Sequence, residues 1–291
     1  QSYQLDEVEI VGNSVLSDDE IKEKMKSKPS FWRYLFDTGF LNNEILRYDM
    51  EKLQGSYEDR GYLDFKVINI EKIYDDEYVS LKIHVVEGRP YTVRTVGMKW
   101  TPVLGDKDAK QIFVEEDLNV NIDVVPGLLY NRATEKADIK RLSTKYNNLG
   151  HLEFHCRTVL KPDPATLEVD VVYHIYEGNP SVIRDIKIVG NTITRDHVIR
   201  RELAIHPTDL SNQRLIDVTK NRLLQLGYFN SVDIIPLQTG VEGQKDLLIK
   251  VDDKETGRVN FGAGVSSASS FIGTIGFQQN NFDWGAGWPY R

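Results

Sequence analysis

Residues 85–91 read VVEGRPY, and residues 175–181 repeat the pattern as IYEGNPS. A looser form, VDDKETG, stands at residues 251–257. Each segment follows a Gly that ends a helical pattern, and the distance from that Gly to the closing Glu is nearly constant at 26, 27 and 28 residues (61 to 87, 150 to 177 and 227 to 255). Equal spacing of unlike landmarks indicates an internal repeat, so we expect three copies of one unit of about 75–90 residues.

Each unit is predicted to run strand, helix, helix, strand, strand. In the first unit, an alternating run over residues 7–11 predicts a half-buried strand that ends at Gly12. Ser17 and Glu20 have the spacing of a capping box for a short helix. An apolar stripe that stops at Gly61 predicts a second, longer helix, and two alternating runs around a polar turn predict a hairpin.

The predicted fold class is α+β, with three tandem modules of β-α-α-β-β topology and two helices on one face of each three-stranded mixed sheet. The expected modules are residues 1–89, 90–180 and 181–256, followed by a β-hairpin in residues 257–291. The front half of the second module, residues 99–126, departs from the repeat, and the sequence does not place its first helix.

The last segment differs in composition from the modules. From Gly257 onward Gly, Ser and aromatic residues predominate, and apolar residues alternate with small or polar ones over residues 259–266 and 271–278. Two such strands of about ten residues are typical of a transmembrane β-barrel. An ordinary hairpin that caps the third module has the same pattern. A barrel closes with at least about eight strands, so the barrel interpretation requires strands beyond Arg291.

Composition excludes several classes of protein. The chain has 291 residues and a formal net charge of −8, which argues against a nucleic-acid partner. Its single cysteine, Cys156, excludes an internal disulfide. No apolar run reaches the ~20 residues of a membrane-spanning helix. Because the sequence starts at Gln1 without a basic and apolar leader, we expect any targeting signal to be missing or already removed.

No residue pattern predicts catalysis or a metal site. His155 and Cys156 are neighbours on one predicted strand, so their side chains should point to opposite faces of the sheet. The sequence has no G-x-S-x-G, P-loop or H-E-x-x-H motif. Acidic runs such as residues 75–77 fit solvated turns. We therefore predict a non-enzymatic protein without metal or cofactor.

The order of these landmarks resembles POTRA domains, the tandem modules that precede the barrel in BamA-type outer-membrane assembly factors. The resemblance is strongest over residues 183–227, which contain IVGNT at residues 188–192. RVNFGAGVSS at residues 258–267 is similar to the first barrel strand of that family, and GFQQNNF at residues 276–282 to the segment that leaves the second strand. Only residues 99–126 lack a match.

The resemblance implies a bacterial outer-membrane protein with its POTRA modules in the periplasm. Its implied partners are unfolded outer-membrane proteins, accessory lipoproteins of the assembly complex, and the outer membrane through the barrel. In this family the strand after the second helix is the exposed edge of the sheet, where an extended chain can be added. The resemblance maps this strand to residues 64–70, 153–159 and 232–235. The residues expected to contact clients in the first two modules are Asp64, Phe65, Lys66, Val67, Ile68, Glu153, Phe154, His155 and Arg157.

The Glu-Gly-x-Pro segments are expected to set the angle between modules. Gly88 and Gly178 give the backbone freedom, whereas Pro90 and Pro180 fix φ. We favour a rigid turn over a hinge at both positions.

The predicted function is assembly of outer-membrane proteins, in which the modules receive unfolded precursors and feed them to the barrel. Two alternatives remain open. The chain could belong to a relative that translocates one dedicated client or serves autotransporters, or it could be a periplasmic scaffold in which the repeats are spacers.

Overall fold

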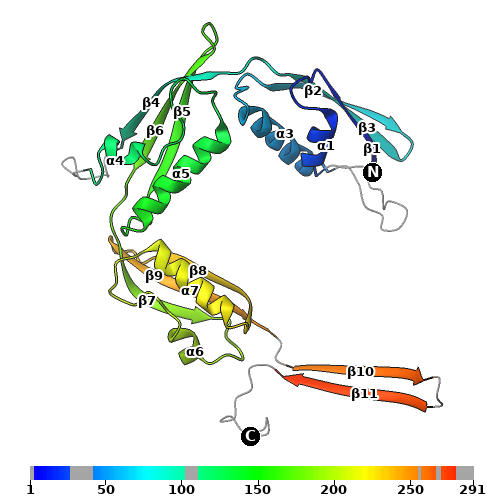
Figure 1. Cartoon of the computed structure of the whole chain (residues 1–291), viewed down its shortest axis with the longest axis vertical. Helices are drawn as coiled ribbons and strands as arrows, with labels where there is room; N and C mark the ends of the chain where they lie inside the picture. Colours follow the sequence, from blue (N-terminus) through cyan, green and yellow to red (C-terminus); the bar gives the residue numbers. More distant parts are fainter. Residues whose placement is uncertain (1–2, 27–41, 102–110, 255–256, 267–269, 280–291) are drawn as a thin grey trace. The chain divides into compact units, whose positions relative to one another are not determined.

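The structure of the chain is a computed structural model, shown in Figure 1, and it describes residues 3–26, 42–101, 111–254, 257–266 and 270–279. The chain divides into two compact units. The first comprises Gln1–Ser143 and His155–Tyr176, and the second comprises Thr144–Phe154 and Glu177–Arg291. The middle module therefore contributes its helix end and the following loop to the second unit.

The predicted β-α-α-β-β order occurs three times. The first module consists of β1 (Gln4–Val11), α1 (Asp18–Lys24), α3 (Asn43–Glu58), β2 (Lys66–Asp75) and β3 (Tyr78–Val86). The second consists of β4 (Thr92–Trp100), α4 (Glu115–Asn119), α5 (Arg132–Asn147), β5 (His155–Asp163) and β6 (Glu168–Tyr176). The third consists of β7 (Val182–Val189), α6 (Asp196–Arg200), α7 (Gln213–Gln225), β8 (Phe229–Gln238) and β9 (Gln244–Asp253).

The last strand of each module lies in the middle of its sheet. The strand orders are β1-β3-β2, β4-β6-β5 and β7-β9-β8, with the first pair parallel and the second antiparallel in each. The sheets are therefore mixed, as the sequence predicted. A separate antiparallel ribbon follows, formed by β10 (Gly257–Ser266) and β11 (Ser270–Gln279). No helix in the described ranges is long and apolar enough to cross a membrane.

Local sequence explains where the elements begin and end. Ser17 and Glu20 form the predicted capping box at the start of α1. The helix that the sequence did not place is α4, a short helix within residues 99–126. Gly97 lies within β4 and pairs with Val172 of β6.

Each module has an apolar core between its helices and the buried face of its sheet. In β3 the buried residues alternate with exposed or half-buried ones, and Val79, Leu81 and Ile83 are at most 1% exposed. They belong to one cluster with Ile21 of α1 and Leu53 of α3. The central strand is thus covered by both helices of its module, and its hydrogen-bonding edges are occupied by its two neighbours.

A buried carboxylate at the end of the central strand holds the turn that follows the first strand. In the first module, Glu87 accepts hydrogen bonds from the backbone N–H groups of Ser14 (2.7 Å) and Val15 (2.9 Å) and from the hydroxyl of Tyr57 (2.8 Å). The Ser14 hydroxyl donates to the other carboxylate oxygen. Burial favours a raised pKa, but these donors outweigh it and hold the pKa of Glu87 below its ordinary value.

The third module uses a different residue for this role from the one the repeat spacing suggested. Asp253 accepts from the backbone N–H of Ile193 (2.7 Å) and from the hydroxyl of Thr194 (2.7 Å). The prediction that aligned Glu255 with Glu87 is therefore wrong, and Glu255 itself lies outside the described residues.

Replacing Glu87 by Gln should destabilise the first module by about 2 kcal/mol, because charge-assisted hydrogen bonds to a buried acceptor are lost. The readouts are the urea unfolding midpoint and the hydrogen-exchange rates of the Ser14 and Val15 amides. Glu77→Gln, on an exposed turn, should leave both unchanged and is the matched control.

The difference in unfolding free energy between the native chain and the Glu87→Gln variant should also depend on pH, and in one direction only. Because the folded pKa of Glu87 lies below its ordinary value of 4.5, its stabilisation is complete above about pH 4.5 and is lost as the pH falls through the lowered pKa. An advantage that grew in acid would contradict the assignment.

Candidate functional site

The strand after the long helix lies at an edge of every sheet. Within the described residues β2, β5 and β8 each pair on one side only, with β3, β6 and β9 respectively. Such an edge presents backbone N–H and C=O groups that can pair with another extended chain. The topology therefore places an exposed edge strand where the sequence predicted it.

The three edges differ in regularity. The ladder of β2 shifts register between Val67 and Asn69, and that of β8 shifts between Phe229 and Ser231. The ladder of β5 has no shift along its whole length. Because a bulge interrupts the even spacing of backbone groups, β5 is the most regular of the three edges for strand addition.

Five of the predicted contact residues lie on these edge strands. Lys66, Val67 and Ile68 are on β2, and His155 and Arg157 are on β5. Ile68 occupies the bulge and is 67% exposed. Apart from half-buried Val67, the others are exposed as well.

The other four lie before the strands, so the predicted strand starts at residues 64 and 153 are wrong. Phe65 and Phe154 are buried and stack on tyrosines of the preceding helices. The ring centroids of Phe65 and Tyr57 are 4.0 Å apart, and those of Phe154 and Tyr146 are 4.4 Å apart. These phenylalanines are core residues, because their rings cover the end of the long helix.

The remaining two, Asp64 and Glu153, lie where one module meets the next. Asp64 accepts a hydrogen bond from the hydroxyl of Tyr91 (2.7 Å), the residue that follows Pro90. Glu153 accepts from Lys245 (2.5 Å) and from Gln238 (2.9 Å). These acids occupy matching positions, each three residues after a glycine that ends a helix.

The joints share one backbone arrangement. In the first unit, the carbonyl of Gly61 accepts a hydrogen bond from the N–H of Tyr91 (2.9 Å). In the second unit, the carbonyl of Gly150 accepts one from the N–H of Ser181 (3.1 Å). The glycine that ends the long helix of one module thus receives the first amide of the next module.

Both helix-ending positions require glycine for two reasons. Gly61 has φ +84° and Gly150 has φ +94°, a conformation that L side chains rarely adopt. A Cβ on Gly61 would lie 3.1 Å from the Leu129 side chain, and a Cβ on Gly150 would lie 2.9 Å from that of Leu210. The glycine that marks each repeat in the sequence is therefore closely packed against a side chain at each joint.

The predicted inter-module turns also lie at the joints. Gly88 and Gly178 adopt positive φ, and they lie against Asp64 and Glu153, respectively. Whether these turns are rigid stays a prediction. Pro90 and Pro180 directly precede the residues whose amides bond to the helix-ending glycines.

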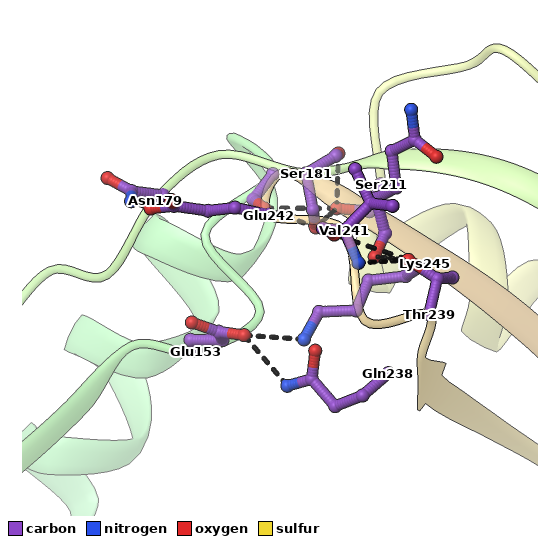
Figure 2. Close-up of polar contacts among 11 residues, drawn as sticks. Glu153, Asn179, Ser181, Ser211, Gln238, Thr239, Val241, Glu242 and Lys245 are labelled. Atoms are coloured by element: carbon purple, nitrogen blue, oxygen red, sulfur yellow. Dashed lines mark hydrogen bonds and ion pairs between the residues drawn. The ribbon is translucent and has the colours of Figure 1, made fainter.

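The joint in the second unit is the more polar of the two, and Figure 2 shows its contacts. The hydroxyls of Ser181 and Ser211 lie 2.8 Å apart, and the Ser211 hydroxyl also donates to the carbonyl of Gly150 (3.0 Å). On the other side, Lys245 and Gln238 point toward Glu153 (Figure 2). Their hydrogen bonds lower the pKa of Glu153. A cavity of about 260 Å³ lies beside this group.

The described residues contain no group of three or more His, Cys, Asp or Glu side chains placed to hold a metal ion. The ring of His155 lies 4.6 Å from that of Tyr176. Burial raises the pKa of the Cys156 thiol to about 12, so it is not a reactive thiolate at neutral pH.

Three segments of the chain, residues 3–88, 110–178 and 181–254, match the family model of POTRA, the surface antigen variable number repeat. These segments make up most of the sequence, and the chain belongs to the POTRA family.

The curated relatives that this chain is similar to are BamA proteins. The outer membrane protein assembly factor BamA of Neorickettsia risticii is 29% identical, covering 94% of this chain and 36% of the relative. That of Neisseria meningitidis serogroup B is 27% identical, covering 97% of this chain and 35% of the relative. The chain thus spans about a third of the length of these relatives.

A solved structure shows the same fold. The crystal structure of Haemophilus influenzae BamA POTRA3-5 matches with a TM-score of 0.69 at 19% identity, over 87% of this chain and 97% of that one. The chain is accordingly a POTRA region of the BamA type.

Gly150→Ala should destabilise the second unit more than Gly227→Ala. Both glycines have positive φ, which costs an alanine about 1–2 kcal/mol. Only Gly150 also meets a neighbouring side chain, which adds about 1–3 kcal/mol, whereas nothing lies within 4 Å of a Cβ at Gly227. Urea unfolding of the two variants measures the difference. Equal losses in the free energy of unfolding would show that the contact with Leu210 does not contribute to the cost of Gly150→Ala.

Proposed function

We propose that this chain is the receiving arm of an outer-membrane protein assembly factor. It binds unfolded β-barrel precursors by strand addition at β2 and β5 and passes them to a barrel. The observation that carries the proposal is the edge strand β5, which within the described residues pairs on one side only and has no register shift in that pairing. The names of the BamA relatives support the assignment to outer-membrane protein assembly.

Strand addition suits a receptor with many different clients. Its hydrogen bonds come from the main chain, so an incoming segment needs an extended conformation more than a particular sequence. The exposed residues of β5 are His155, Arg157, Lys161 and Pro162, and the first three are polar. A polar edge does not aggregate readily by itself but leaves its backbone groups accessible to a chain that is already extended. This edge is therefore suited to transient binding.

The β10–β11 ribbon supports attachment to a membrane barrel. Val259 pairs with Phe277 and Phe261 with Ile275, and these four side chains are 51–78% exposed. The alternate positions carry residues such as Asn260 and Thr274. A ribbon with one exposed apolar face needs a cover, and we propose that lipid provides it in a barrel that begins here. The full reading frame should then continue with alternating strands after Arg291.

Accessory lipoproteins are proposed to dock on the modules. The basic pair on and beside α6 is already engaged locally, since Arg200 pairs with Asp196 (2.5 Å) and Arg201 with Glu202 (3.2 Å). These residues would have to exchange partners to serve in docking. Translocation of a dedicated client and a scaffold role without client binding remain the competing functions.

A photoreactive amino acid at Arg157 or Lys66 should cross-link to an unfolded barrel-protein peptide, because both positions are on exposed edge strands. The same amino acid at Ala133 of α5 or Glu51 of α3, exposed positions on the helices, should give little product and is the matched control.

The pattern of products separates the competing functions. Cross-links confined to the helix positions would refute strand addition, and no product at any position would favour the scaffold. Cross-linking to only one peptide of an unrelated set would favour a dedicated client.

A further inference from the structure

The two joints use the same backbone arrangement but different side-chain pairs. At the first joint the acid Asp64 meets a neutral phenol, that of Tyr91. At the second joint the acid is one methylene longer, and Glu153 meets the ammonium group of Lys245. Serine stands at the position of the phenol, as residue 181, and its hydroxyl lies 2.8 Å from that of Ser211 instead. Each joint therefore has its own combination of acid and partner: the shorter acid Asp64 with a neutral phenol, and the longer acid Glu153 with a charged ammonium group.

The partner at the second joint is far away in sequence and unusually buried. Lys245 lies at the start of β9, 92 residues from Glu153, and its side chain is 7% exposed, compared with 40% for Glu153. A buried ammonium group is costly unless an opposite charge and further hydrogen bonds compensate it. The opposite charge that Lys245 of the third module contacts is thus supplied by Glu153 of the preceding module.

The third module lacks an acid at the corresponding position. Three residues after Gly227 stands Asn230, which donates to Asp252 (3.1 Å) and to the carbonyl of Asp253 (3.4 Å) within its own module. The acid is thus present only where another module follows in the described chain. This restriction ties it to the joint rather than to the folding of a single module.

We propose that Glu153 and Lys245 are a positioning pair that fixes the third module to the end of α5, and that the matched pairs make the two joints non-interchangeable. The pair carries this role because its members come from the two sides of the joint, one is buried, and the contact is direct. Asp64 and Tyr91 have the corresponding role at the first joint.

A charge swap in the complete chain tests the pair. Glu153→Lys and Lys245→Glu should each disrupt the joint, and the double variant should restore it, because the adjacent cavity of about 260 Å³ leaves room for the exchanged side chains. The readouts are hydrogen exchange of the Ser181 amide, which is bonded to Gly150, and the spread of spin-label distances between exposed positions on α5 and α7.

Each single variant should raise the exchange rate of the Ser181 amide at least tenfold and broaden the distance distribution, and the double variant should return the rate to within threefold of the native one. Lys250→Glu, an exposed charge change on the same strand, should alter neither readout. If Lys245→Glu fails to fold, Lys245→Met and Glu153→Gln give the same comparison without a buried acid.

Placing the aspartate of the first joint at position 153 tests whether each acid suits only its own partner. Glu153→Asp keeps the charge but shortens the reach to Lys245, so it should behave like Glu153→Gln in both readouts. The proposal is overturned if the single variants resemble the native chain, if the double variant shows the sum of the two single effects, or if Glu153→Asp is silent.

Discussion

The arrangement of this chain depends on a hydrogen bond from the first amide of a module to the carbonyl of the glycine that ends the long helix before it. Gly61 and Tyr91 form this bond at one joint, and Gly150 and Ser181 form it at the other. Only glycine combines the positive φ with the close approach of Leu129 or Leu210. The bond therefore fixes both the end of the helix and the beginning of the next sheet.

The consequences extend to the edge strands. After the helix-ending glycine the chain makes a turn that buries Phe65 or Phe154 against the helix, and the edge strand starts only beyond that residue. The acids before it, Asp64 and Glu153, are engaged by the next module. The residues just before each edge strand are thus used for the joint, while within the described residues β2 and β5 each pair on one side only.

Much of this fold could be predicted from the sequence because the landmarks of the repeat are residues with a geometric task. The glycines and the Glu-Gly-x-Pro segments recur because every joint needs them, and strand and helix patterns are local. The strand starts were predicted too early because Phe65 continues the alternation of the strand, although its ring packs on Tyr57 before the ladder begins.

Two features depend on contacts that a single sequence does not reveal. Asp253 has the role expected of Glu255, and only the hydrogen bonds of the folded turn reveal this. From the sequence a lysine such as Lys245 is expected to be exposed, and its partner Glu153 is 92 residues away. A pair of this kind depends on which distant residues meet at the folded joint and not on the local sequence pattern.

The most direct measurement is residue-resolved hydrogen exchange of the complete chain, with and without an unfolded barrel-protein peptide. We expect the Tyr91 and Ser181 amides to be protected in both states and the outward-facing amides of β2 and β5 to gain protection only when the peptide is present. Rapid exchange at Tyr91 and Ser181 would rule out the proposed joints, and new protection confined to the helices would rule out strand addition.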